Sequence, residues 1–312
     1  MLIIDAERTR SLLPFAELVP ALETAFCEPV EVPLRHNHSI APDSDSPGCM
    51  LLMPAWNRQG FLGIKTVTIY PHNASKGRPG LHSTYMLHNA ETGAPLALID
   101  GNEITSRRTA AASALAASFL SREDAASLLV VGAGRVASLL AYAYRAVRPI
   151  RQVAVWDINP AQAATLVEQL QRDGFEAWVA DDLEAACAHA DIVTCATLST
   201  TPLILRDWLR DGTHLDLIGG FTPQMRETDD ACFAGTSVFV DTYEAVLKAG
   251  DLLSPLASGA LLESDIRSNL ASLCQGKHPG RATAKEITVF KAVGTALEDL
   301  AAAQLVYLQH SK

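Results

Sequence analysis

The stretch that decides the fold of this 312-residue chain is SLLVVGAGRVA, residues 127–137. Its first half is apolar without alternation, which is typical of a strand buried on both faces of a parallel sheet. Gly132, Gly134 and Ala137 then follow the pattern G-x-G-x-x-A. The first glycine allows a tight turn into a helix, the second lets a pyrophosphate approach the backbone, and the small third residue lets helix and strand pack closely. Gly132, Gly134, Arg135 and Val136 are therefore predicted to bind a dinucleotide cofactor.

The residues after this turn support a dinucleotide site. RVASLLAYAYRAV (135–147) is typical of a helix, and QVAVWD (152–157) of a second strand. Asp157 ends that strand 25 residues after Gly132, near the spacing of an acid that binds the ribose hydroxyls. A carboxylate there repels a 2′-phosphate, so the sequence favours NAD(H) over NADP(H). The alternative is a glycine turn that binds nothing.

Four more apolar strands follow in alternation with helical stretches. They are EAWVA (176–180), DIVTCAT (191–197), HLDLIGG (214–220) and SVFVD (237–241). This alternation predicts an α/β domain over residues 123–276, with a doubly wound parallel sheet of the Rossmann type. Ligands in such folds lie outside the carboxyl ends of the strands. Thr197 is therefore predicted to line the cofactor, with a ligand-free polar loop as the alternative.

The sequence before residue 123 has a different texture. A helical pattern runs over 15–26, and residues 50–100 form short apolar or alternating runs separated by turn clusters, which predicts a mostly antiparallel sheet. TAAASALAASFL (109–120) predicts a helix that Thr105 or Ser106 caps.

The closing segment ITVFKAVGTALEDLAAAQLVYL (287–308) is predicted to form one long helix that packs back on the N-terminal part. Residues 1–122 and 277–312 would then form a discontinuous α+β domain. Glu298 and Asp299 are predicted to lie on a solvated face of this helix.

Composition narrows the class of protein. With 25 Lys and Arg against 35 Asp and Glu, the net charge is −10, which disfavours a general nucleic-acid binder. The N-terminus MLIIDAERTRSLLPF does not match a signal peptide, and the apolar stretch 110–120 is too short to cross a membrane. Six scattered cysteines without a C-x-x-C pair fit buried free thiols in the cytoplasm. No metal site is predicted, because the histidines of His36-Asn37-His38 lack a third ligand at a recognisable spacing.

Three basic residues in the first domain are candidates for binding an acidic substrate. The planar guanidinium of Arg108, at the start of the Ala-rich helix, suits bidentate binding of a carboxylate. Lys65 lies inside the apolar run GIKTVTI, and Arg35 precedes the histidine pair. Ordinary solvent-exposed side chains are the alternative for each of them.

The chain resembles the ornithine cyclodeaminase/mu-crystallin family from end to end. The resemblance rests on LLMPAW, the G-x-K of GIKTVTIYPHN, ETGAPLALIDG, IT-x-x-RTAAASALAA, VVGAGRVA and GKHPGR-x-T-x-x-EITVFKAVG-x-ALEDLAAA. It implies a homodimer in which the discontinuous domain holds a small imino or amino acid and pairs with its partner. The resemblance also implies that Arg35, Lys65 and Arg108 engage the substrate carboxylate. Lys65 would also stand near the reacting imine, and Val293 and Gly294 near the nicotinamide.

Two positions depart from the family pattern. Phe221 stands where the cyclodeaminases have an aspartate that handles protons on the amines, and Gly80 replaces a hydroxyl residue in a substrate turn. Phenylalanine cannot exchange a proton. The leading interpretation is therefore an NAD(P)H-dependent oxidoreductase of the cyclic ketimine (pyrroline-2-carboxylate) type. The alternatives are an ornithine cyclodeaminase, which forms proline and ammonia with His82 or Asp216 as its base, and a non-catalytic nucleotide- and ligand-binding protein of the mu-crystallin type.

Overall fold

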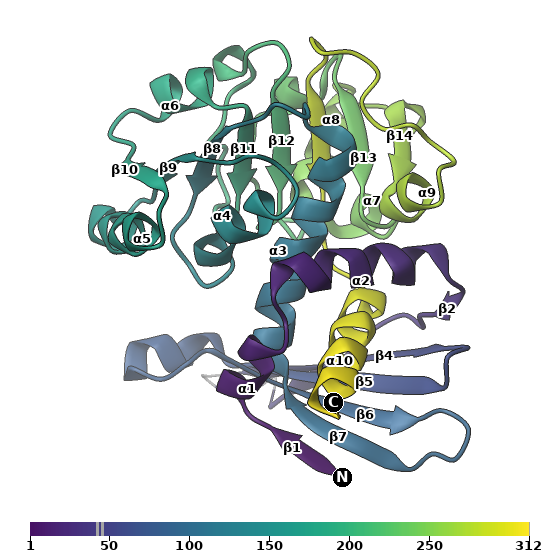
Figure 1. Ribbon diagram of the computed structural model, residues 1–312. Coiled ribbons are helices and arrows are strands. Elements are labelled where there is room, and N and C mark those ends of the chain that lie inside the picture. Colours follow the sequence, from purple (N-terminus) through teal and green to yellow (C-terminus); the bar gives the residue numbers. More distant parts are fainter. Residues whose placement is uncertain (42–43, 45–46, 312) are drawn as a thin grey trace. The chain divides into compact units, whose positions relative to one another are not determined.

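The computed structural model describes residues 1–311 except 42, 43, 45 and 46 (Figure 1). The chain divides into two compact units. Unit 1 combines Met1–Arg108 with Thr295–Lys312, and unit 2 is Thr109–Gly294. These bounds differ from the sequence-based ones at 122/123 and 276/277.

Unit 1 contains a seven-stranded sheet in the order β1-β7-β6-β5-β4-β2, with β3 also paired to β4. All its ladders are antiparallel except β1 with β7, as the alternating texture predicts. The strands are β1 (Leu2–Ile4), β2 (Val30–Glu31), β3 (His36–Ile40), β4 (Gly48–Asn57), β5 (Phe61–Ile69), β6 (Leu81–Asn89) and β7 (Pro95–Asp100). The helices are α1 (Ala6–Ser11), α2 (Phe15–Cys27), α10 (Ala296–His310) and the 3-10 helix Pro71–Lys76.

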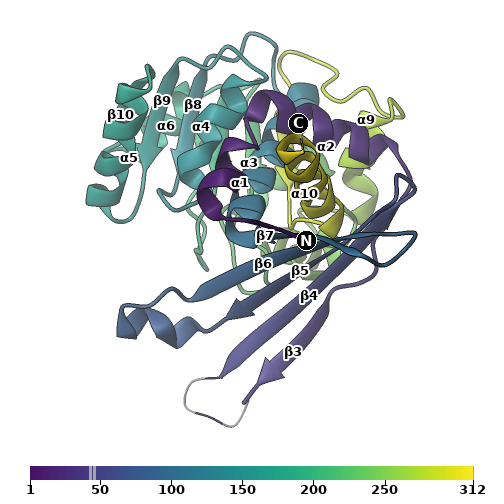
Figure 2. The ribbon, with the colours of Figure 1, turned by 60° about the horizontal axis from the view of Figure 1, so that its bottom comes forward.

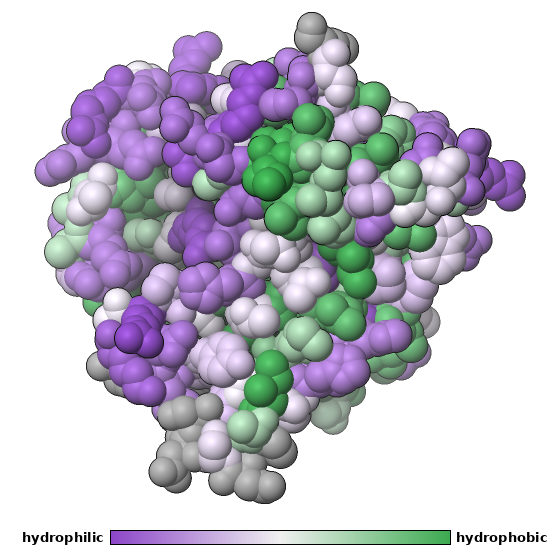
Figure 3. All heavy atoms as spheres, turned by 90° about the horizontal axis from the view of Figure 1, so that it is seen from below, coloured by the Kyte–Doolittle hydropathy of each residue, from purple (hydrophilic) through white to green (hydrophobic). Residues whose placement is uncertain are grey.

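The two faces of this sheet differ in burial. Side chains two residues apart along a strand share a face, so each strand contributes every second residue to a face. Across β4, β5, β6 and β7, the row Met53, Lys65, Tyr85 and Ile99 is buried. Helix α10 packs against β4, β5, β6 and α2 (Figure 2). The alternate residues on these strands are partly buried or exposed. Figure 3 shows both hydrophobic and hydrophilic side chains on the side seen from below.

Unit 2 contains an eight-stranded, fully parallel sheet in the order β10-β9-β8-β11-β12-β15-β13-β14. The Rossmann-type fold predicted from the sequence is confirmed. The strands are β8 (Ser127–Val131), β9 (Gln152–Trp156), β10 (Glu176–Val179), β11 (Ile192–Cys195), β12 (His214–Leu217), β13 (Ser237–Val240), β14 (Ile266–Asn269) and β15 (Thr288–Lys291). The helices are α4 (Ala137–Arg145), α5 (Pro160–Arg172), α6 (Leu183–His189), α7 (Ala245–Lys248), α8 (Gly250–Ser258) and α9 (Leu270–Cys274), with 3-10 helices at Arg206–Trp208, Asp230–Phe233 and Glu263–Asp265.

The prediction of one long C-terminal helix was wrong in its first part. Residues Thr288–Lys291 form β15, which is buried throughout and lies between β12 and β13. Their β-branched and aromatic side chains suit a doubly buried strand. Gly294, with φ of +76°, ends this segment, and the Thr295 side chain caps α10.

The predicted start of the Ala-rich helix was also wrong. Helix α3 (Gly101–Leu120) begins four or five residues before the expected caps. The hydroxyls of Thr105 and Ser106 donate to the carbonyls of Gly101 and Asn102, one turn earlier, as Ser and Thr do inside a helix. Asp100 instead accepts a hydrogen bond from the N–H of Glu103.

Two general expectations concern thiols and membranes. All six cysteines are free, but Cys27 is exposed, and Cys49 and Cys274 are only partly buried, so burial holds for three of them. Within the part of the chain that the structure describes, no helix is both long enough and apolar enough to cross a membrane.

Candidate functional site

The glycine turn after β8 has the geometry that its sequence predicts. Gly132 has a φ of +105°, and a Cβ there would lie 2.8 Å from the carbonyl oxygen of Ala196. Gly134 has no atom within 4 Å of the position of a Cβ, so the backbone is open to an approaching group. Arg135 is exposed and Val136 partly buried just before α4. The turn therefore combines a close packing contact with an accessible backbone.

Asp157, directly after β9, is tied to this turn. Its Oδ2 accepts a hydrogen bond from the N–H of Ala133 (2.7 Å), and its Oδ1 accepts one from the N–H of Asn159 (2.8 Å). A carboxylate oxygen can accept more than one hydrogen bond, so Asp157 retains the capacity to bind hydroxyls. The predicted ribose-binding acid is thus fixed beside the glycine turn.

A buried carboxylate joins the ends of β11 and β12. Glu227 Oε1 accepts hydrogen bonds from the N–H and the hydroxyl of Thr197, at 2.7 and 2.8 Å. Its Oε2 accepts the N–H of Gly219 at 2.7 Å. Burial raises the pKa of Glu227 to about 7. Thr197, predicted to line the cofactor, is therefore held in place from inside the fold.

A second buried carboxylate supports the first. Asp251 Oδ1 accepts the N–H of Glu227 at 2.7 Å, and its Oδ2 pairs with Lys291 Nζ at 3.1 Å. A Cβ on Gly220 would lie 2.1 Å from that Oδ2, so the space beside the glycine is filled. Sequence reasoning missed Glu227, Asp251 and Lys291, because no local spacing connects residues on such distant segments.

Phe221 follows this glycine pair, and its side chain is 45% exposed. It is therefore available to a ligand rather than being part of the core. Asp216, one of the two bases considered for a cyclodeaminase, is fully buried and accepts hydrogen bonds from the hydroxyls of Ser113, Thr194 and Tyr144. This burial makes Asp216 unsuitable as a base for a bound substrate. His82, the other considered base, is exposed on β6.

Asp241 organises the segment predicted to lie near the nicotinamide. Its Oδ2 accepts the N–H groups of Val293 and Gly294, at 2.7 and 2.6 Å. Asp241 directly follows β13, and the two donors follow β15, the neighbouring strand. This carboxylate therefore fixes the backbone conformation of Val293 and Gly294.

Unit 1 contains a buried cluster of two cations and two carboxylates. Lys65 Nζ lies 2.7 Å from Asp299 Oδ2, and Arg108 Nε lies 2.9 Å from Asp299 Oδ1. Arg108 Nη1 lies 2.6 Å from Glu298 Oε2. All four side chains are at most 7% exposed. The prediction that Glu298 and Asp299 face solvent was wrong, because α10 packs against β5 and turns this face inward.

The cluster has perturbed proton affinities. Burial lowers the pKa of Lys65 to about 8, and the negative charge of Asp299 opposes that shift. Burial would raise the pKa of Asp299, but the charges of Lys65 and Arg108 lower it below its ordinary value. With two positive and two negative groups, the cluster is neutral overall. Lys65 and Arg108 are therefore not the solvent-exposed side chains of the alternative reading.

Two further residues bear on this cluster. Tyr85 pairs with Lys65 across β5 and β6 and is fully buried, and its hydroxyl has no hydrogen-bond partner among the described residues. Gly63 gives that hydroxyl its space, because a Cβ there would lie 2.0 Å from it. Arg35 is partly buried in the segment between β2 and β3. The ion pairs thus bring together two of the three predicted cations.

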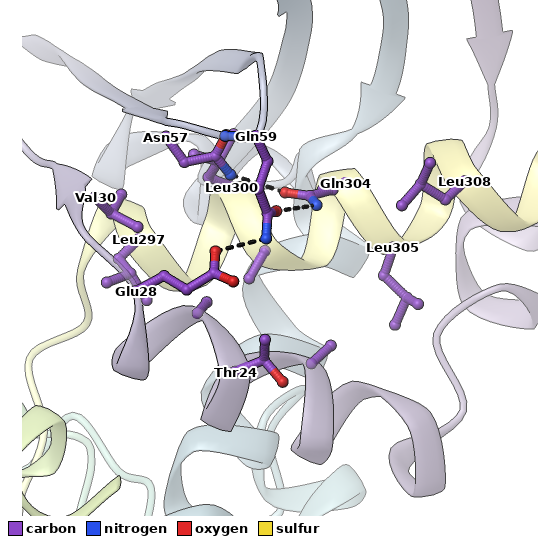
Figure 4. Close-up of a pocket in the computed structure, with 13 residues that line it drawn as sticks. Thr24, Glu28, Val30, Asn57, Gln59, Leu297, Leu300, Gln304, Leu305 and Leu308 are labelled. Carbon is purple, nitrogen blue, oxygen red and sulfur yellow. Dashed lines mark hydrogen bonds between the residues drawn. The ribbon is translucent and has the colours of Figure 1, made fainter. Parts of the chain in front are cut away.

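A cavity of about 170 Å³ lies between α2 and α10 (Figure 4). Its apolar wall includes Leu297, and a chain of hydrogen bonds crosses it from Asn57 through Gln304 and Gln59 to Glu28. None of the residues predicted to bind substrate or cofactor lines it. Among the residues that the structure describes, no group of three or more His, Cys, Asp or Glu side chains is arranged to hold a metal ion.

Comparison with known proteins identifies the family. The sequence model of the ornithine cyclodeaminase/mu-crystallin family matches residues 2–312, so the chain belongs to that family. A Δ1-pyrroline-2-carboxylate reductase of Colwellia psychrerythraea is 39% identical, over 98% of both chains. The Thermococcus litoralis Δ1-pyrroline-2-carboxylate reductase, solved with NADH and L-proline, is similar with a TM-score of 0.93 and 34% identity, over 100% of this chain and 98% of that one. An archaeal alanine dehydrogenase dimer with bound NAD has a TM-score of 0.90 and 29% identity, over 100% and 97%.

Proposed function

We propose that this member of the family is an NAD(H)-dependent reductase of a small cyclic ketimine acid, Δ1-pyrroline-2-carboxylate or a close analogue. The observation that carries the proposal is the buried cluster around Lys65 and Arg108, which places an ammonium and a guanidinium group side by side. Relatives and one solved structure named as pyrroline-2-carboxylate reductases support it.

The cofactor is held by unit 2 in this proposal. The open backbone at Gly134, the tight turn at Gly132 and the carboxylate of Asp157 fit a pyrophosphate and a ribose. Arg135, Val136, Thr197, Val293 and Gly294 complete the proposed contacts. Asp157 disfavours a 2′-phosphate, so we assign NAD(H) rather than NADP(H). When bound, the cofactor supplies the hydride.

The substrate carboxylate is held by Arg35, Lys65 and Arg108. Arg108 uses Nε and Nη1 for Asp299 and Glu298. Among the described residues, this leaves Nη2 for a substrate carboxylate. Lys65 is the proposed catalytic residue, because its ammonium group can donate a proton to the imine nitrogen while hydride arrives at the imine carbon. The pKa of about 8 places that proton transfer near neutral pH.

Phe221 favours ketimine reduction over ornithine cyclisation. Cyclisation needs a neutral amine nucleophile, and an alkyl amine has a pKa of about 10.4 in water. The exposed Phe221 supplies no base, and the buried Asp216 has no free access to a ligand. Reduction of a preformed imine needs no such base.

We further propose that the protein is a cytoplasmic homodimer. Pro54, Ile64, Met86 and Leu98 form a row across the partly buried face of the unit 1 sheet, next to the exposed Trp56. A contiguous apolar face of this kind is typical of a protein interface. The related alanine dehydrogenase is a dimer. Ile64→Asp should therefore yield monomers in sedimentation equilibrium, whereas a wild-type monomer would refute the pairing.

Three incubations test the activity. Oxidation of NADH with pyrroline-2-carboxylate supports the reductase. Proline and ammonia formed from ornithine with catalytic NAD⁺ would establish the cyclodeaminase instead. No activity in either assay, together with measurable NADH binding, would indicate a non-catalytic binding protein. Failure to bind any pyridine nucleotide would refute all three readings.

A further inference from the structure

Asp299 contacts both cations of the buried cluster. Its Oδ2 pairs with Lys65, and among the described residues that oxygen has no other partner. Its Oδ1 accepts the Nε–H of Arg108, and Glu298 Oε2 accepts the Nη1–H of the same guanidinium group. One carboxylate therefore sets the separation between the ammonium and guanidinium groups.

Stability is a weak reason for such a cluster. Removing two ion pairs from water costs free energy that their attraction often fails to recover, and well-packed apolar residues can be equally stable. The flexible Lys65 side chain also loses rotamer entropy when it is held. A function for the precise arrangement accounts better for burying four charges.

We propose that Asp299 is a positioning residue for the reduction, which keeps Lys65 protonated and fixes Lys65 and Arg108 in one mutual orientation. This inference rests on the proposed function. The proton of Lys65 goes to the imine nitrogen, NADH supplies the electron pair as hydride to the imine carbon, and the neutral Lys65 amine then takes a proton from solvent. Asp299 contacts neither substrate nor cofactor in this scheme.

The charges around Lys65 give the direction of the effect. Asp299 and Glu298 on α10 and Arg108 on α3 act on it, and the buried, uncharged Tyr85 pairs with it from β6. Burial lowers the pKa of Lys65, and Asp299 is the largest influence that raises it. Loss of the Asp299 charge should lower that pKa further, so Lys65 would be neutral and unable to donate a proton at pH 8.

The test compares Asp299→Asn with Glu298→Gln, a matched removal of the neighbouring charge. For Asp299→Asn, the alkaline limb of the pH profile of kcat/KM should move to lower pH. At pH 8, kcat/KM should fall by about 100-fold, which is the usual contribution of a general acid. Glu298 raises the pKa of Lys65 less than Asp299 does, so Glu298→Gln should raise KM but move that limb by less than Asp299→Asn does. The affinity for NADH should be unchanged in both variants. Equal pH profiles for Asp299→Asn and wild type would overturn the proposal.

A measurement without substrate separates this inference from the proposed function. The ¹⁵N resonance of Lys65 Nζ, assigned through Lys65→Arg, should titrate at lower pH in Asp299→Asn than in wild type. An unshifted titration overturns the role of Asp299 even in an active reductase. Absence of ketimine reduction by the wild type refutes the proposed function, whatever the titration shows. If Asp299→Asn does not fold, Asp299→Glu provides the test. This variant should keep the alkaline limb of kcat/KM at its wild-type pH but lower kcat. An unchanged kcat would contradict a positioning role for Asp299.

Discussion

Replacing Asp216 by Asn should change how the stability of the protein depends on pH. Asp216 lies on β12, is fully buried and accepts three hydroxyl hydrogen bonds. Burial nevertheless raises its pKa from 3.8 to about 6. The pKa of this carboxyl is therefore about 2 units higher in the folded state than in the unfolded chain. At about 1.4 kcal/mol per unit, ionising it in the folded state costs roughly 3 kcal/mol more than in the unfolded chain.

The sign follows from proton linkage. Below about pH 4 the carboxyl is protonated in both states, so ionisation imposes no penalty. Between about pH 4 and pH 6 the unfolded chain loses the proton first, and the folded state becomes less favourable by up to about 3 kcal/mol. Asparagine does not titrate. The free energy of unfolding of Asp216→Asn minus that of wild type should therefore rise by about 3 kcal/mol across this window, whatever constant offset the amide introduces.

Urea unfolding at a series of pH values measures this difference. Asp191→Asn is the matched control, because hydrogen bonds and Arg122 lower the pKa of Asp191 to about 2 against the effect of burial. Its difference curve should fall as pH rises from about 2 to 4, since the variant lacks the stabilisation that the ionised carboxylate supplies. A flat difference curve for Asp216→Asn between pH 4 and 6 would refute the reasoning.

Three other substitutions test the proposed sites. Arg108→Lys keeps the charge but loses the guanidinium fork, so KM for the ketimine should rise about tenfold or more while NADH affinity measured by fluorescence stays constant; an equal loss of NADH affinity would contradict the assignment. Gly132→Ala forces a Cβ to 2.8 Å from a carbonyl oxygen at a φ of +105°, so NADH affinity should fall by at least about tenfold, with circular dichroism as the check on folding. Phe221→Asp should create measurable formation of proline and ammonia from ornithine, and no gain would mean that more than this residue separates the two activities.

The local parts of the fold could be predicted from the sequence. The turn at Gly132 and its acid Asp157 follow from contiguous motifs, because each requirement is met within about 25 residues. The start of α3 was misplaced, since Thr105 and Ser106 resemble caps when only local sequence is considered. Strand β15 was missed because Thr288–Lys291 adjoins a helix and pairs with strands far away in the chain.

The buried networks could not be predicted for the same reason. Glu227, Asp251 and Lys291 have no motif, and their hydrogen bonds exist only once four separate segments meet. The proposed roles of Arg35, Val293 and Gly294 come from family resemblance. The structure adds the hydrogen bonds by which Asp241 fixes the backbone of Val293 and Gly294.

A physical signal for the unit 1 cluster was nevertheless present in β5. Gly63, Lys65 and Val67 occupy alternate positions and therefore share one face of the strand. Gly63 and Val67 fit a buried face, and a lysine in the same row requires a carboxylate partner within the core. That requirement predicts an acid somewhere on the covering helix, but it does not identify Asp299. Charged residues in α10 were assigned to solvent by polarity alone, whereas the partner that buried Lys65 needs could have reversed that assignment.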